Sequence, residues 1–394
     1  MLLRLLLFQV FFLSLPDLYI YRTFVRKVAR STFYKILYWV PTLFFTLGIL
    51  TLIYGNYNHN LLNEHPNASG IFIIFLFTIG FSKLIYATVS FVGTRCHRIW
   101  HWRRKGFRIT GTILAACFTL VMLYGWIYGK ERFEVKEVTL TSEHIPAAFD
   151  GYRIAQLSDF HAGGWENNTE AVEHLVKMTN DLHPDLLVFT GDLVSSHTDE
   201  LTPFAPILQQ LKATHGVYSI LGNHDYSDYY IWDNEEDKAE DAQRLIEAQK
   251  AMGWKMLNNS HVYLHRGNDS IALIGVENQG DPKFPQHGNL PEAMRGIQGD
   301  IYQILLSHNP KHWHQEVVGK TPINLMLAGH THGMQLSLGN FSPASFVYPE
   351  WRGLYTQGKQ HLYVNLGCGH IMYPLRIGAW PEITLITLRS AQSR

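Results

Sequence analysis

The length of the apolar stretches divides the chain into two parts. Residues 1–130 contain four long stretches, at about 2–21, 36–54, 71–92 and 109–128, whereas residues 131–394 contain only short ones. Each long stretch has about the 20 residues that a helix needs to cross the hydrocarbon core of a bilayer. Four such stretches in succession leave no polar face for water. We therefore predict an N-terminal four-helix transmembrane region.

The first stretch is the least typical, because it contains Arg4 and Asp17. It could be a secretory signal peptide, but its end lacks the small-residue cleavage pattern of such peptides, so we expect a retained helix. Lys83 lies in the middle of the third stretch, where a charge often marks a functional site. No acidic residue in the neighbouring stretches stands out as its partner. We expect this lysine to face the helix bundle or to reach toward the bilayer surface.

Basic residues are unevenly distributed over the loops between these stretches. The second loop, residues 55–70, has no lysine or arginine, whereas the first and third loops contain Arg22, Arg26, Lys27, Arg30, Lys35, Arg95, Arg98, Arg103, Arg104, Lys105 and Arg108. Short basic loops remain on the cytoplasmic side. The sequence thus predicts a multi-pass integral membrane protein whose lipid partner is the bilayer and whose chain after Lys130 is extracytoplasmic.

Short apolar runs rich in β-branched residues recur after residue 131, each bounded by Gly, Asp or Asn. They predict strands within residues 152–159, 184–192, 216–225, 271–276, 300–310, 323–332 and 361–367. Residues 167–183 and 234–253 have helical patterns. Because the strand runs are nearly continuous in apolar residues, we expect a layered α/β domain over residues 131–394.

The composition excludes some classes of function. The formal net charge is zero, so the chain as a whole gives no electrostatic reason to expect a nucleic-acid partner. The three cysteines, Cys96, Cys117 and Cys368, lack the spacing of a metal site or of a disulfide framework. Nothing in the sequence indicates an obligate protein partner.

Polar residues follow five of the predicted strands where each strand ends. They are Asp159, His161, Asp192, Asn223, His224, Asp225, His308, His330 and His332. In open α/β sheets, sites form outside the carboxyl ends of the strands. With 21 histidines in the chain, several independent core or surface histidines are the alternative interpretation. The joint occurrence of these residues at strand ends instead indicates a site for two metal ions that share a carboxylate.

The residue types narrow the choice of metal. Carboxylate, amide and imidazole ligands without a thiolate suit Mn, Fe or Zn, and the sequence does not distinguish among these three. Two neighbouring cations can lower the pKa of a shared water and bind the oxygens of a phosphate.

This ordered set of motifs resembles that of the calcineurin-like metallophosphoesterases. The segments "FDGYRIAQLSDFH" and "YVNLGCG", with "PLRIGAWPEITLITL" after them, resemble the membrane-tethered subgroup related to UDP-2,3-diacylglucosamine hydrolases. The resemblance covers nearly all of residues 135–390 and implies a four-layer α/β/β/α sandwich. Met334 departs from the glycine that this subgroup more often has, which affects only the expected shape of the pocket.

The resemblance also implies how the ligands are shared. One ion would be bound by Asp159, His161, Asp192 and His332, and the other by Asp192, Asn223, His308 and His330. His224 directly follows a ligand and is the expected general acid, because imidazole titrates near neutral pH. Asp225 could orient protonated His224, or it could only cap a turn.

Other polar residues have weaker patterns. His370 and Arg376 follow the last predicted strand and could contact the phosphate or the leaving group, or could have only a packing or surface role. His312 and His314 fall in a predicted helix and are expected to be solvated. His197, His261, His265 and His287 are interpreted as surface residues.

The expected function is hydrolysis of a phosphomonoester, phosphodiester or pyrophosphate by a membrane-anchored enzyme that acts on a small-molecule or lipid phosphate, such as an envelope component. A UDP-2,3-diacylglucosamine-type pyrophosphate hydrolase of lipid A metabolism is one alternative. A non-catalytic sensor or scaffold that retains the fold is another. A protein Ser/Thr phosphatase is disfavoured, because "GDLVSSHTDE" lacks the Asp-Arg-Gly expected there.

Overall fold

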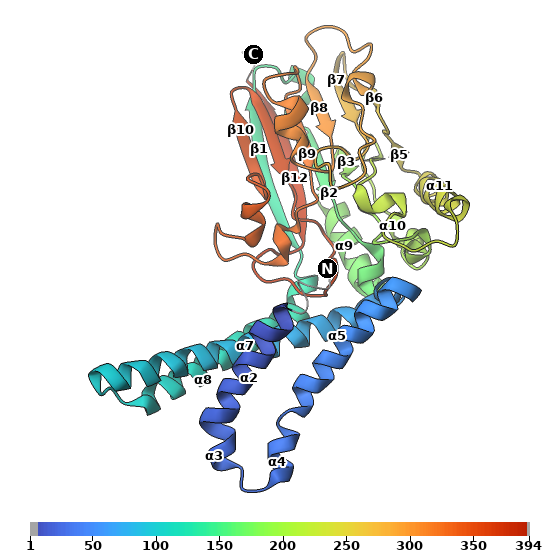
Figure 1. Cartoon of the computed structure of the whole chain (residues 1–394). Coiled ribbons are helices and arrows are strands. Elements are labelled where there is room, and N and C mark those ends of the chain that lie inside the picture. Colours follow the sequence, from blue (N-terminus) through green and yellow to red (C-terminus); the bar gives the residue numbers. More distant parts are fainter. Residues whose placement is uncertain (1–6, 392–394) are drawn as a thin grey trace. The chain divides into compact units, whose positions relative to one another are not determined.

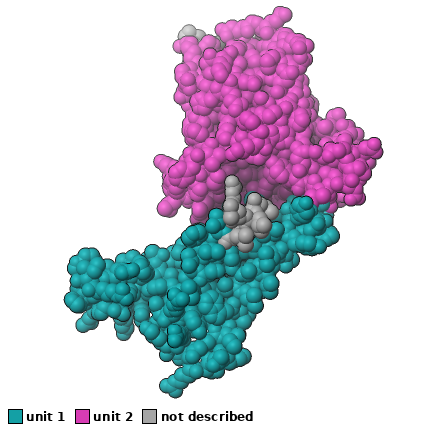
Figure 2. All heavy atoms as spheres, viewed as in Figure 1, with its two compact units in different colours: residues 1–128, 372–375 teal, residues 129–371, 376–394 magenta. Residues whose placement is uncertain are grey.

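The computed structural model describes residues 7–391, and it contains two compact units. One unit comprises the chain up to Tyr128 together with Met372–Leu375, and the other comprises Gly129–Ile371 and the chain from Arg376 onward (Figure 2). Each unit is described by itself below.

The first unit is helical (Figure 1). Its elements are η1 (Gln9–Ser14), α2 (Leu15–Ile20), η2 (Tyr21–Val25), α3 (Arg26–Val28), α4 (Thr32–Leu37), α5 (Val40–His59), α6 (Leu61–Glu64), α7 (Pro66–Trp100) and α8 (Arg104–Ile127). Among the described residues, three helical stretches are long and apolar enough to cross a membrane: Thr32–His59, Pro66–Trp100 and Arg104–Glu131. They include the second, third and fourth stretches expected from the sequence. The expected first helix, residues 2–21, lies partly outside the described residues, and its described part is helical but is not one of these three stretches.

Helices α7 and α8 lie side by side (Figure 1). A Cβ on Gly93 of α7 would lie 2.3 Å from the Cβ of Phe107 on α8, so the absence of a side chain there allows the two helices to approach closely. Ser82 of α7 and Thr119 of α8 share a hydrogen bond of 2.8 Å between their hydroxyl groups. Small residues and hydroxyl contacts of this kind are typical of helix packing in membranes.

The expectation that Lys83 has no acidic partner is wrong. Its ammonium lies 2.9 Å from a carboxylate oxygen of Asp17, which is fully buried. Tyr38 donates a hydrogen bond of 2.8 Å to the same carboxylate, and the Thr42 hydroxyl also donates to it. The pair joins residues that are 66 positions apart, on α2 and α7, so local sequence gives no sign of it.

The second unit contains two mixed six-stranded sheets. The first has the order β1 (Glu134–Ser142), β12 (Glu382–Ser390), β2 (Arg153–Leu157), β3 (Leu186–Phe189), β4 (Val217–Ser219) and β5 (Lys255–Met256). The second has the order β10 (Gly353–Gln357), β11 (Gln360–Val364), β9 (Leu325–Ala328), β8 (Gln303–Leu306), β7 (Asp269–Gly275) and β6 (Ser260–Arg266). Strands β2, β3, β4 and β5 are mutually parallel, as are β7, β8, β9 and β11. Each parallel set therefore ends at one edge of its sheet.

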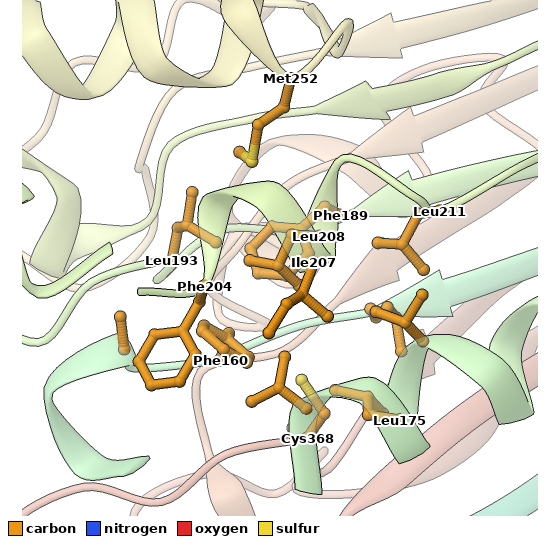
Figure 3. Packing of buried hydrophobic residues seen from close by; sticks show 14 of the residues in the cluster. Phe160, Leu175, Phe189, Leu193, Phe204, Ile207, Leu208, Leu211, Met252 and Cys368 are labelled. Carbon is orange, nitrogen blue, oxygen red and sulfur yellow. The ribbon is translucent and has the colours of Figure 1, made fainter. Parts of the chain in front are cut away.

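Apolar side chains form one layer between the sheets and one on each outer face. Ile154 and Val188 of the first sheet share a buried cluster with Leu306 and Leu327 of the second. On the outer face of the first sheet, a second cluster joins Phe189 to residues of α9 (Thr169–Asp181), α10 (Ala205–Leu208) and α11 (Glu235–Ala251), and Figure 3 shows part of it. A third cluster lies between the second sheet and the short α12 (Leu290–Ala293) and η8 (Trp313–Val317). The layers therefore run helix, sheet, sheet, helix.

The local predictions for this unit are mostly confirmed. The seven predicted strand runs overlap β2, β3, β4, β7, β8, β9 and β11, and the two helical patterns contain α9 and α11. Strands β1, β5, β6, β10 and β12 were not predicted. His312 was expected to be solvated, and this expectation is wrong, because the ring is buried with its Nδ1 2.9 Å from the Ser307 hydroxyl.

Candidate metal centre

Two groups of possible metal ligands lie at the carboxyl ends of the parallel strands. In the first group, Asp159 and His161 follow β2, and His332 follows β9. Their ligand atoms all lie within 4.8 Å of one another. The Nε2 atoms of His161 and His332 are 3.0 Å apart, and His332 Nε2 lies 3.1 Å from the Asp159 carboxylate. Two ring nitrogens and a carboxylate therefore converge in one buried place.

The second group contains Asp192, His308 and His330, which follow β3, β8 and β9. His308 Nε2 lies 3.1 Å from Asp192 Oδ2 and 3.2 Å from His330 Nδ1. His308 Nδ1 lies 2.8 Å from the Thr190 carbonyl oxygen, which can only accept, so Nδ1 carries a proton. In neutral His308, the lone pair is therefore on Nε2, toward the other members of the group.

Asp192 lies between the two groups. Its Oδ2, besides contacting His308, is 3.6 Å from His161 Nε2 in the first group. Asn223 follows β4 at the same edge, and its side-chain carbonyl oxygen is buried without a hydrogen-bond partner. An unpaired buried polar atom costs free energy, and its presence here fits an oxygen that binds a cation.

Backbone strain is concentrated at these residues. Positive φ angles occur at Asp159 (53°), His161 (48°), Asp192 (59°), His330 (71°) and His332 (49°). Non-glycine residues rarely adopt this left-handed conformation, and such strain clusters at functional sites. Five of the seven residues predicted as ligands thus share an unfavourable conformation.

Two glycines allow the loops to approach closely. A Cβ on Gly222 would lie 2.2 Å from Asp192 Oδ1, and a Cβ on Gly329 would lie 2.2 Å from Asp159 Oδ2. Both distances are shorter than any real contact of this kind. Any side chain at either position would therefore displace a carboxylate of the site.

Neighbouring charges shift the pKa values of the residues in the second group. Burial lowers the pKa of His308, but the adjacent Asp192 carboxylate outweighs burial and raises it to about 9. Burial, assisted by the charge of His308, lowers the pKa of His330 to about 3. Burial opposes ionisation of Asp192, yet the neighbouring histidines, His308 first among them, keep its pKa well below the usual range. In the absence of a cation, His308 therefore supplies the positive charge that balances Asp192.

His224 lies beside both groups. Its Nδ1 is 2.6 Å from the Ser195 carbonyl oxygen, its ring stacks on Tyr229 with 4.0 Å between centroids, and it makes an edge contact with His161 at 4.8 Å. Because the carbonyl only accepts, Nδ1 donates, and a second proton on His224 would be carried by Nε2. The ring is therefore held in one orientation by the carbonyl and by stacking.

The expectation that Asp225 orients His224 disagrees with its contacts. The buried Asp225 carboxylate accepts hydrogen bonds from the backbone N–H groups of Gly222, Asp192, Leu193 and Val194, at 2.8 to 3.2 Å. Burial and the nearby Asp192 charge raise the pKa of Asp225 to about 7. Asp225 thus joins the loop after β3 to the loop after β4, which is closer to the turn-capping alternative.

The expected phosphate contact of Arg376 also disagrees with its position. The guanidinium is fully buried and donates to the carbonyl oxygens of Gly369 and Ala379. Its guanidinium also donates to His332 Nδ1 at 2.9 Å. His370 is 4% exposed and lies near Gly164, not at an open surface.

Two residues near the site, Glu200 and Tyr348, were not predicted from the sequence. Glu200 accepts from the backbone N–H groups of Gly163 at 2.9 Å and Ser195 at 2.6 Å, so it holds the residue whose carbonyl orients His224. Tyr348 contacts His330 through its hydroxyl, 2.8 Å from Nε2. Neither residue belongs to a strand-end motif, and a lone carboxylate or tyrosine in a loop gives no signal of such a contact.

The set of ligands fits divalent cations. It offers carboxylate oxygens, imidazole nitrogens and one unpaired amide oxygen, all at a buried edge, and it contains no thiolate. Hard and borderline cations such as Mn, Fe and Zn prefer these ligands.

Comparisons with known proteins agree with this geometry. Residues 152–334 match the family model described as calcineurin-like phosphoesterase, and residues 3–130 match that described as probable calcineurin-like phosphoesterase, transmembrane domain. The chain is 32% identical over 288 residues to the Danio rerio "Transmembrane protein with metallophosphoesterase domain", covering 71% of this chain and 63% of that protein. It is 32% identical over 295 residues to the Bacillus subtilis "Uncharacterized metallophosphoesterase YkuE", covering 71% of this chain and 94% of that protein.

One relative matches almost from end to end. The Campylobacter jejuni "Uncharacterized metallophosphoesterase Cj0846" is 25% identical over 387 residues, which cover 95% of this chain and 96% of that protein. The present chain spans less than two thirds of the Danio rerio relative but nearly all of the two bacterial ones. The chain belongs to the calcineurin-like metallophosphoesterases, metal-dependent hydrolases of phosphoesters, and carries that domain after an N-terminal transmembrane domain.

Proposed function

We propose that this protein is a membrane-anchored dinuclear-metal phosphoesterase. One ion is bound by Asp159, His161, Asp192 and His332. The other is bound by Asp192, Asn223, His308 and His330. The observation that carries the proposal is the position of Asp192, whose Oδ2 lies 3.1 Å from His308 Nε2 and 3.6 Å from His161 Nε2.

The chemistry of the site follows from these groups. When bound, two cations would lower the pKa of a water and bind phosphate oxygens. His224 protonates the leaving alkoxide from Nε2, since its Nδ1–H is held by the Ser195 carbonyl. Tyr229 keeps the ring in place by stacking on it. Asp225 and Glu200 act through the backbone and are positioning residues.

The proposed substrate is a phosphomonoester, phosphodiester or pyrophosphate of a lipid or envelope component. The proposal includes a fourth transmembrane helix at about residues 2–21 and an extracytoplasmic catalytic domain, supported by the basic first and third loops. This location disfavours the UDP-2,3-diacylglucosamine alternative, because UDP-linked intermediates are normally cytosolic. A reporter that is active only outside the cytoplasm, fused to the C-terminus, should be active, and an inactive reporter would reverse the orientation.

The decisive experiment combines metal analysis with hydrolysis. The full-length protein, purified in detergent, should contain two metal ions per chain. Chelation should abolish cleavage of bis(p-nitrophenyl) phosphate, and later addition of Mn, Fe or Zn should restore it. Asp192→Asn should lower the affinity for both metal ions. Asp181→Asn, at an exposed aspartate, serves as the matched control. Retention of two ions by Asp192→Asn would refute the shared carboxylate. Full metal content without hydrolysis of any phosphoester would favour the sensor or scaffold alternative.

A further inference from the structure

An exposed apolar surface follows the second histidine of the metal centre. Residues 333–349 contain no Asp, Glu, Lys or Arg. Large apolar side chains of this segment are exposed to solvent, and we call them together the apolar surface: Met334, Leu336, Leu338, Phe341, Phe346 and Val347. Leu338 and Phe346 are 85% and 79% exposed. The Phe341 and Phe346 rings contact each other, with 5.8 Å between their centroids. Large exposed apolar patches mark binding surfaces for proteins or membranes.

The segment is held in place from beneath. The buried Ser342 hydroxyl donates to the Gly333 carbonyl oxygen at 2.6 Å and accepts from the Ala344 backbone N–H at 3.0 Å. Ala344 and Tyr348 belong to a small buried cluster with Trp351, Leu366 and Ala379. The same segment therefore buries its small and polar residues and turns its largest apolar side chains outward, the reverse of the usual distribution.

The membrane domain determines which partner fits this surface. Only residues 128–133 connect the end of α8 to the start of β1, and an extended chain of that length spans about 20 Å. The catalytic domain is therefore confined close to a bilayer. An uncharged surface with exposed Phe and Leu side chains meets no electrostatic cost on entering the interfacial region, where apolar burial is favourable.

We propose that the apolar surface enters the interfacial layer of the bilayer to which the chain is anchored. The occupant is lipid, and neither a second copy of this chain nor another protein. Because the segment begins directly after His332 and includes Tyr348, whose hydroxyl contacts His330, this contact would bring the metal centre to the level of lipid headgroups. The proposal concerns binding alone and does not require the proposed catalytic function.

Site-specific photocrosslinking of the full-length protein tests the contact. Benzoylphenylalanine is introduced in place of Phe346 or, separately, Leu338, and the protein is reconstituted into vesicles of phosphatidylcholine and phosphatidylglycerol. Tyr263, 38% exposed on β6, provides the matched control position on the same domain. After irradiation, mass spectrometry should find lipid adducts at positions 346 and 338 and none at 263.

Other outcomes overturn the proposal. Crosslinks from position 346 to a second copy of the chain would identify a protein interface, and equal lipid labelling at 346 and 263 would mean a non-specific encounter. Absence of any adduct at 346 and 338 would mean that the surface faces water. As a second variant, Leu338→Glu with benzoylphenylalanine retained at 346 should lower the lipid adduct by about tenfold, because a charge opposes entry into the apolar layer. No arm of the experiment measures turnover.

Discussion

Asp225 accepts a hydrogen bond of 2.8 Å from the backbone N–H of Asp192, so the carboxylate of one strand-end aspartate holds the main chain of the other. The same Asp225 carboxylate accepts from three further N–H groups. Such a contact fixes the carboxylate that lies between the two metal groups without occupying a ligand position. We therefore expect Asp225 to act as a positioning residue.

Asp225→Asn should lower both stability and metal affinity. An amide presents an N–H₂ group to backbone N–H donors, so at least one charge-assisted hydrogen bond is lost, at a cost of about 2 kcal/mol. Thermal unfolding and metal content of the purified protein measure the two effects, with Asp181→Asn as the exposed control. If turnover fell while stability and metal content stayed at wild-type values, Asp225 would instead support His224.

His224→Ala should leave the metal content unchanged and lower turnover by about two orders of magnitude or more, as expected for the loss of a general acid. The defect should depend on the leaving group. A p-nitrophenolate leaves without protonation, so p-nitrophenyl esters should be less affected than alkyl phosphoesters. His265→Ala, exposed on β6, is the control. Equal losses for both ester classes would remove His224 from protonation of the leaving group.

Lys83→Met should be more harmful than the double change Asp17→Asn, Lys83→Met. The single change leaves the buried Asp17 carboxylate without its cation, and the loss of one partner of a buried pair costs about 3–5 kcal/mol. The double change removes both charges. The yield of monodisperse protein in detergent and its unfolding temperature measure the difference, with exposed Lys27→Met as the control. Equal effects of the single and double changes would show that the pair contributes nothing to folding.

His370 should make the second unit, residues 129–371 and 376–394, less stable at acid pH. Burial, assisted by the charge of Lys130, lowers the pKa of His370 to about 3. Because the folded-state pKa lies below the unfolded value near 6.5, the unfolded chain binds more protons between these two values, and stability falls as the pH falls through 6.5. The loss contributed by this residue is about 2 kcal/mol at pH 5.

His370→Gln cannot be protonated and should reduce the decrease in unfolding temperature between pH 7.5 and pH 5. The other buried histidines contribute equally to both proteins, so the difference between the two curves isolates His370. Parallel curves would show that the His370 side chain reaches solvent in the folded state.

The sequence predicts what depends on local pattern and fails where contacts are tertiary. The apolar runs of β2, β3, β4, β8 and β9 are parallel strands, and parallel strands end at a common edge, so the residues after them could be placed together from the sequence. The orientation of side chains within that edge could not. The Asp225 carboxylate binds backbone N–H groups, and the Arg376 guanidinium points inward to His332. The residue type alone predicts neither contact. The pairing of Lys83 with Asp17 depends on how separate helices pack, which apolar periodicity does not encode.

Each group of possible ligands draws on both sheets. Asp159, His161 and Asp192 belong to the first sheet, whereas His308, His330 and His332 belong to the second. Bound cations would therefore join the two halves of the sandwich at this edge, in addition to the buried apolar cluster between the sheets and the hydrogen bond from Gln156 Nε2 to the Ala328 carbonyl oxygen. A substitution that changes the packing of this cluster, with no change at the edge, should therefore alter the spacing between the ligands that the two sheets contribute.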